Sequence, residues 1–284
     1  MRATGLVRDP AGRLSWLKIA VLLFAVSHAL VLGLRWQMHA LGPRPITEAI
    51  LVTGLWAIRF LLLSLAVTPA RAVLDWGRAG MLRRMLGVTA ACYAAAHLTL
   101  YALDQRWRLL HVAHEIAVRF YLTIGFVALL GLLALAITST DGWQRHLGAR
   151  WKKLHRLAYG VAVLALLHYA IQSKANITDA VLLAGLFAWL MYWRLLRRRW
   201  QQKLWPLLGL TLAAGATASV FEAGWYAVRN HVAPLLVWDA NFDLSYGPRP
   251  SVWVLILGVA AVALAMARRT RKRRGMPRGA VRQA

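Results

Sequence analysis

The chain has 284 residues, of which 60% are hydrophobic and 16% charged, and it carries a formal net charge of +25. Soluble globular domains use roughly 45–50% apolar and about 25% charged residues, so this composition excludes an ordinary soluble domain. The single cysteine, Cys92, also excludes an internal disulfide and an iron–sulfur cluster held by several cysteines.

Apolar stretches recur along the whole chain, and several approach the roughly 20 residues that an α-helix needs to cross a bilayer. Because lipid offers the backbone no hydrogen-bond partner, these stretches are expected to be helices. The sequence therefore predicts an all-α, polytopic transmembrane helical bundle of about eight spans. The apolar stretches are 16–34, 49–68, 85–103, 116–138, 156–171, 180–196, 205–228 and 252–267.

Basic residues cluster in every second connection between these stretches, while the alternate loops are poorer in them. The clusters are the N-terminal arm (Arg2, Arg8, Arg13 and Lys18), 71–84, 145–156, 194–203 and the tail from Arg268. The positive-inside rule then predicts a multi-pass membrane protein with both termini in the cytoplasm. Nucleic acid is not a predicted partner; the basic face instead suits anionic lipid or an acidic protein.

The length and composition of the loops divide the chain into three predicted regions. Residues 1–44 form an arm and an anchor helix, 45–200 hold the intramembrane histidines, and 201–284 form a transmembrane hairpin with a basic cytoplasmic tail. No repeat at a fixed period is evident. There is also no glycine-rich nucleotide motif on a strand–helix unit, so electrons would have to arrive from another protein or a diffusible carrier.

Three histidines lie in or next to membrane-length stretches: His97 in the third, His168 in the fifth, and His155 at the basic entry to the fifth. Ionisable residues inside a membrane usually serve a function, and histidines that face each other in a helical bundle can ligate haem iron. His155 and His168 are 13 residues apart, roughly 20 Å along a helix but about 140° apart around it. His97 and His168 are both predicted toward the periplasmic ends of their spans. The ligation of iron by this outer pair does not depend on that angle. Hydrogen bonding between neighbouring helices explains these two histidines equally well, and interfacial placement explains His155.

Three segments carry a resemblance to a known family: TGLWAIRFLLLSLAVTPARAV, LRRMLGVTAACYAAAHLTLYALD and LGARWKKLHRLAYGVAVLALLHY. Over roughly residues 15 to 200 the chain resembles the ferric-reductase-like transmembrane family, and within it the haem-binding membrane subunits of protein-methionine-sulfoxide reductase systems. The resemblance implies that His97, His155 and His168 ligate haem iron. It also implies that Arg83 stands where two-haem relatives carry a fourth histidine.

The resemblance further implies a function in electron transfer. One or two b-type haems, with FMN or a quinone as a further redox molecule, would carry electrons from the quinol pool or a cytoplasmic flavin reductase. The acceptor would be a periplasmic molybdopterin reductase that repairs oxidised methionine, and no side chain of this chain would be catalytic. Three alternatives stay open: a ferric or superoxide-type transmembrane reductase, a haem-free transporter or channel, and a scaffold whose histidines only join helices.

Several other residues are candidates for contact with the cofactor or partner. Arg59 lies inside the second span, where it could neutralise a haem propionate or a phosphate, or pair with a helix carbonyl. Gly87 and Gly160 could let a porphyrin approach, although small residues in membrane helices more often serve helix packing. Glu115 and Arg119 open the fourth span, where they could position a periplasmic partner or simply start a helix.

Overall fold

The structure is a computed structural model that describes residues 7, 12–174, 176–245 and 247–274, with side chains up to residue 270. Its regular structure is helical, as predicted, and no strand occurs in the described residues. Arg2 and Arg8 of the predicted basic arm, and the tail beyond Arg274, lie outside these residues.

Seven helical segments of the described chain are long and apolar enough to cross a membrane. They are α1 (Trp16–Gln37), α2 (Pro45–Val73), the 3₁₀ turn η1 (Gly77–Met81) with α3 (Leu82–Asp104), α5 (Phe120–Ile137), α7 (Ala149–Leu154) with α8 (Leu157–Gln172), α10 (Leu204–Asn230) and α12 (Pro250–Arg274). The remaining predicted stretch, 180–196, forms α9 (Thr178–Leu195), a helix of 18 residues that ends in Arg194 and Leu195. The number of spans and the side of each terminus stay predictions.

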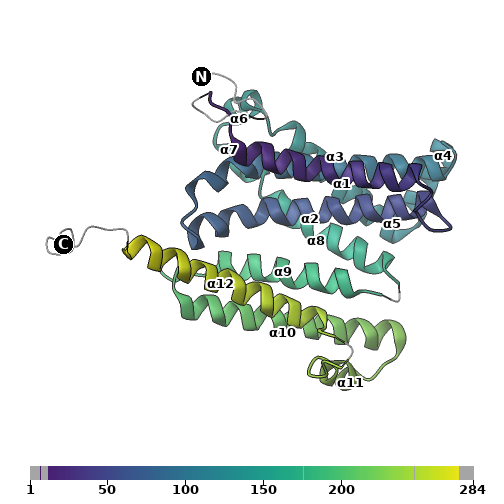
Figure 1. Ribbon diagram of the computed structural model, residues 1–284. Helices are drawn as coiled ribbons and strands as arrows, with labels where there is room; N and C mark the ends of the chain where they lie inside the picture. The colour runs from purple at the N-terminus through teal and green to yellow at the C-terminus, as the bar shows by residue number, and fades with distance from the viewer. Residues whose placement is uncertain (1–6, 8–11, 175, 246, 275–284) are drawn as a thin grey trace. The chain divides into compact units, whose positions relative to one another are not determined.

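The chain separates into two compact units. Unit 1 contains residues 1–65 and 81–174, and unit 2 contains residues 66–80 and 175–284. In unit 1, α5 packs against α3 and α8, and α1 packs against α3. Figure 1 shows the short helix α4 (Leu109–Val118) at one end of these helices, and α6 (Asp141–Leu147) with α7 at the other end.

Two local breaks in unit 1 shape the ends of its bundle. Arg119 has an extended backbone between α4 and α5, and its side chain forms an ion pair with Glu115. At the other end, Gly148 joins α6 to α7 at φ 49°, a left-handed conformation that favours glycine. A further turn at His155 and Arg156 separates α7 from α8. The fifth predicted span is therefore interrupted where His155 lies.

In unit 2, helix α9 packs with α10 and α12 (Figure 1). The Trp189 indole of α9 donates a hydrogen bond to Thr211 Oγ1 on α10 at 3.0 Å, and Tyr192 and Thr217 hydroxyls lie 2.7 Å apart. The boundary predicted at residue 200 therefore differs from the boundary between the compact units near Lys174. The physical reason is that α9 buries its tryptophan and tyrosine against the hairpin helices.

A buried polar cluster joins α10 to α12 and to the connection between them, which contains the short helix α11 (Pro234–Asp239). Glu222 is 2% exposed, and its carboxylate binds Arg249 at 2.7 Å. Nearby, the Asn241 side chain accepts hydrogen bonds from Ser219 and Ser251 and donates to the Val237 carbonyl. Because buried polar groups are costly without partners, these contacts fix the connection to the hairpin.

Close helix packing in unit 2 predicts opposite effects at two glycines. A Cβ at Gly258 on α12 would meet the Thr211 side chain, whereas a Cβ at Gly224 on α10 would have nothing within 4 Å. We expect Gly258→Ala to destabilise the protein by about 1–3 kcal/mol through overpacking. Gly224→Ala should be neutral or stabilising, because alanine favours a helix by about 1 kcal/mol over glycine. Thermal unfolding in detergent measures both variants, and equal melting temperatures would contradict this packing.

Candidate functional site

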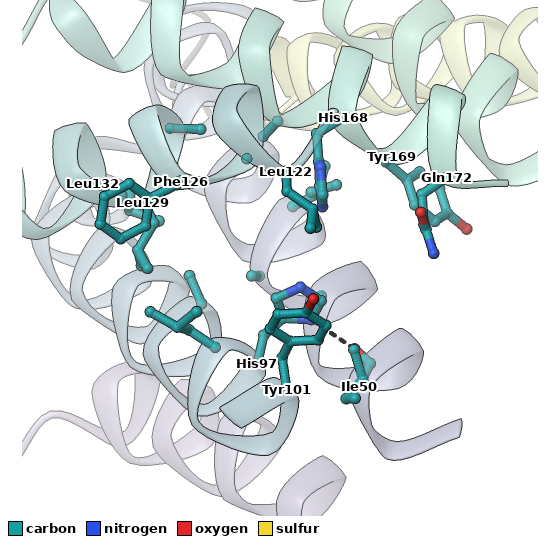
Figure 2. Close-up of a pocket in the computed structure, with 18 of the residues that line it drawn as sticks. Ile50, His97, Tyr101, Leu122, Phe126, Leu129, Leu132, His168, Tyr169 and Gln172 are labelled. Carbon is teal, nitrogen blue, oxygen red and sulfur yellow. Dashed lines mark hydrogen bonds between the residues drawn. The ribbon is translucent and has the colours of Figure 1, made fainter. Parts of the chain in front are cut away.

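A pocket lies inside unit 1 between α2, α3, α5 and α8, with Ile116 of α4 at one end. Most of its lining is aliphatic, as expected for the interior of a membrane bundle. Figure 2 shows two histidine side chains that enter the pocket from opposite helices, His97 from α3 and His168 from α8. They are the residues that the sequence picked out as the outer pair.

The two imidazole rings face each other at a short distance. Their centroids are 6.3 Å apart, and their planes meet at 84°. Each ring is oriented by a hydrogen bond between its Nδ1 and a backbone carbonyl at 2.8 Å, from Ile50 for His97 and from Tyr121 for His168. A carbonyl can only accept, so Nδ1 carries the proton in each ring and Nε2 keeps its lone pair.

Glycines make room for both rings. A Cβ at Gly54 on α2 would lie 2.9 Å from His97 Nδ1, and a Cβ at Gly125 on α5 would lie 2.7 Å from His168 Nδ1. Real Cβ atoms do not approach other atoms so closely, so any side chain at either position would push the imidazole away. Each histidine therefore depends on a glycine one helical turn after the carbonyl that it binds.

The pair fits the axial ligand positions of a haem. With a metal–nitrogen bond of about 2 Å and a ring centre roughly 1 Å behind the nitrogen, two imidazoles on opposite sides of one metal have ring centres about 6 Å apart. The measured separation of 6.3 Å agrees with this arrangement. A hydrogen bond from the second ring nitrogen to a carbonyl is also usual for histidine ligands of metals, because it fixes the tautomer and the ring orientation.

Residues that line the pocket occur in pairs, and the two members of each pair are separated by the same number of positions in the sequence. Three pairs of residues are each separated by 71 positions (168 − 97 = 71): His97 and His168, Gly54 and Gly125, and Ile50 and Tyr121, whose carbonyls accept the hydrogen bonds from the histidines. The same offset pairs every other lining residue except Ile116 and Val161. Helices α2 and α3 thus form one half of the pocket, and α5 and α8 form an equivalent half.

His155 lies apart from this pair and does not line the pocket. Its ring stacks on Trp151 with centroids 3.8 Å apart, and its Nε2 lies 3.3 Å from Ser139 Oγ. The offset of 71 relates His155 to Arg84 (155 − 71 = 84), whereas the family resemblance pointed to Arg83. Arg84 forms an ion pair with Asp141 at 2.5 Å. The Arg83 carbonyl accepts a hydrogen bond from Ser64.

Arg59 also lies away from the pocket. Its guanidinium carbon is 4.9 Å from the centre of the Trp56 ring, in a cluster of aromatic side chains between α1 and α2 that includes Phe24 and His28. A cation above an aromatic face is a favourable contact that needs no cofactor.

The glycines noted in the sequence, Gly87 and Gly160, do not line the pocket. A Cβ at Gly160 would meet nothing within 4 Å, and one at Gly87 would make an ordinary contact with Ser64. Gly54 and Gly125, which do hold the histidines, were missed. The signal that could have found them is their common offset from the histidines, 97 − 54 = 43 and 168 − 125 = 43.

The chain is similar to a known family of membrane proteins. The family described as "Ferric reductase like transmembrane component" matches residues 53–166, a range that includes His97 and His155 and ends two residues before His168. No solved structure matches the chain.

Several curated proteins named "Protein-methionine-sulfoxide reductase heme-binding subunit MsrQ" are similar to the chain. The protein of Xanthomonas euvesicatoria pv. vesicatoria is 44% identical over 166 residues, which cover 57% of this chain and 76% of the relative. That of Xanthomonas campestris pv. campestris (strain 8004) is 45% identical over 184 residues, 60% of this chain and 84% of the relative. That of Azospira oryzae is 36% identical over 197 residues, 68% and 84% of the two chains.

The role of the two buried glycines can be tested with conservative substitutions. We expect Gly54→Ala and Gly125→Ala to lower the haem content of the purified protein, because each new methyl group displaces an imidazole. The matched control is Gly160→Ala on α8, where a Cβ meets nothing within 4 Å. The pyridine haemochrome assay gives the ratio of haem to protein for each variant. Equal ratios in all three would show that the glycines do not position the histidines.

Proposed function

The chain belongs to the MsrQ family of protein-methionine-sulfoxide reductase haem-binding subunits, and on that premise we propose that it holds haem between His97 and His168 to carry electrons across a membrane. The observation that carries the proposal is the pair of facing imidazoles 6.3 Å apart in an apolar pocket. We propose a b-type haem, as in the family; the single cysteine is consistent with this, because it cannot provide the two-cysteine attachment of a c-type haem.

The histidines of this chain supply the ligands and the bundle supplies the surroundings. Nδ1 of each ring is held on a carbonyl, so Nε2 is the nitrogen that binds iron. When bound, haem supplies a reversible one-electron couple whose potential depends on its axial ligands and on burial. Two imidazole ligands leave no open coordination position, which suits electron transfer rather than oxygen chemistry. The aliphatic lining excludes water from the pocket.

The proposed donor and acceptor come from the family resemblance, and the charges at the two ends of the bundle support which end each of them meets. Exposed basic residues gather on α6 and α7 and at the start of α8, including Arg145, Lys152 and Arg156. By the positive-inside rule this end faces the cytoplasm of a bacterial inner membrane, where quinol or a flavin reductase provides electrons. FMN or a quinone is the further redox molecule that this donor would require at the inner end.

The acceptor is a periplasmic methionine-sulfoxide reductase of the molybdopterin class, similar to MsrP. Reduction of one methionine sulfoxide consumes two electrons and two protons and yields methionine and water. A one-electron carrier must therefore deliver electrons twice for each turnover. This chain needs no catalytic side chain for that reaction, since the bond chemistry occurs on the partner.

Substitution of each histidine tests the ligand assignment. We expect His97→Ala and His168→Ala each to abolish the haem that the pair holds, because one imidazole alone leaves an axial position unfilled in a dry pocket. His155→Ala should retain that haem, since its ring lies outside the pocket. Dithionite-reduced minus oxidised spectra and haem stoichiometry measure the outcome. Full haem content in both pair variants would refute the assignment, and a partial loss in His155→Ala would identify a second haem.

The acceptor is tested by mixing the reduced protein with purified partner. Haem oxidation that requires both the molybdopterin reductase and a methionine sulfoxide is the expected result. Oxidation by ferric iron or dioxygen alone would instead favour the ferric or superoxide-type reductase. A colourless protein after haem-replete expression would favour a transporter or scaffold.

A further inference from the structure

The polar residues of the haem pocket are unevenly distributed. Apart from the two histidines, the polar side chains that line it are Tyr101, Tyr121, Tyr169 and Gln172. All four lie on the turns of α3, α5 and α8 nearest to α4. Toward the α6 and α7 end the lining is entirely apolar, and it includes Leu61, Leu132 and Val161. Figure 2 shows this polarity, with Leu129 and Leu132 on one side of the histidines and Tyr169 and Gln172 on the other.

These polar residues also mark where the two halves of the pocket cease to be alike. Deep in the pocket the offset of 71 pairs similar residues, such as Ala57 with Ala128 and Leu61 with Leu132. At the α4 end it pairs Ile50 with Tyr121, Leu98 with Tyr169 and Tyr101 with Gln172. The pocket therefore suits a ligand that is apolar over most of its surface and polar along one edge.

A cation stands beside this polar edge. Arg119, in the break between α4 and α5, donates a hydrogen bond from Nη1 to the Tyr121 hydroxyl at 3.4 Å, and its Nε pairs with Glu115. The hydrogen bond to Tyr121 and the charge of Glu115 raise the pKa of Arg119 above its already high value, so it stays charged. The Tyr101 hydroxyl interacts electrostatically with the charged side chains of Glu115, Arg119 and Asp104.

We propose that the polar rim formed by Tyr101, Tyr121, Tyr169, Gln172 and Arg119 binds the propionate carboxylates of the haem. This inference rests on the proposed haem function and adds the orientation of the cofactor. Haem is apolar except for two carboxylates on one edge, and a carboxylate among aliphatic side chains in a membrane would be very costly. The rim offers hydroxyl, amide and guanidinium donors to that edge. The opposite, vinyl-bearing edge then lies among Leu61, Leu132 and Val161.

The experiment removes the carboxylate charge from the cofactor rather than from the protein. Haem-free protein, prepared from cells limited in haem synthesis, is titrated in detergent with hemin and with hemin dimethyl ester, and the Soret band reports binding. The ester has the same iron and ring but no anionic oxygen. We expect the ester to bind about tenfold more weakly or worse, the effect of losing at least one hydrogen bond to a charged group.

Variants of the rim identify the residues responsible. Arg119→Gln, Tyr101→Phe and Gln172→Leu should each weaken hemin binding and leave ester binding unchanged, so that the preference for hemin shrinks. The matched control is Arg108→Gln, which removes an exposed charge from the same end of unit 1 and should change neither affinity. Equal binding of hemin and ester to the unaltered protein would overturn the proposal. So would rim variants that weaken both ligands equally. Failure of both ligands to bind would instead refute the haem function itself.

Discussion

The site depends on one contact that occurs twice, the hydrogen bond from a histidine Nδ1 to a carbonyl of the neighbouring helix. His97 uses the Ile50 carbonyl and His168 the Tyr121 carbonyl, both at 2.8 Å. In each case the glycine one turn further on lets the ring lie against the helix backbone. A helix carbonyl is already bonded within its own helix, so the second hydrogen bond needs the side chain to come very close. That requirement explains why glycine stands at both positions, and why the two rings end at a separation suited to one iron.

Much of the architecture could be predicted because the bilayer constrains it. Helical structure and the membrane-spanning character follow from long apolar stretches, since lipid leaves the backbone no other partner. His97 and His168 could be placed at similar depth by counting residues from the basic ends of their helices. The directions in which the histidine side chains point could not be predicted. A straight helix gave an angle of about 140° between His155 and His168, and the structure interrupts that helix at His155. Even so, His155 does not line the pocket but packs on Trp151.

The features that sequence reasoning missed are relations between distant positions. The offset of 71 residues is longer than the period of a usual repeat protein, and several of the pocket positions that it relates carry different residues, such as Ile50 and Tyr121. Identical residues are scattered over the two halves, so the halves share no long continuous segment. Likewise, the membership of α9 in unit 2 depends on Trp189 meeting Thr211 and Tyr192 meeting Thr217. Such pairings are not visible in the apolar pattern of α9 alone.

The repeat also explains how the two ends of the pocket came to differ in chemistry. At the α4 end the equivalent positions are both histidines, and beyond them the rim gains hydroxyl and amide groups. At the α6 and α7 end the position equivalent to His155 is Arg84, which pairs with Asp141 and Gln144 rather than facing the pocket. An imidazole can offer a lone pair to iron, whereas a guanidinium is always protonated and cannot. The half that holds Arg84 therefore carries a permanent charge where the other half carries the imidazole of His155. A bundle that is nearly symmetric in its packing thus has two chemically different ends, a basic end at α6 and α7 and a polar edge of the pocket at the α4 end.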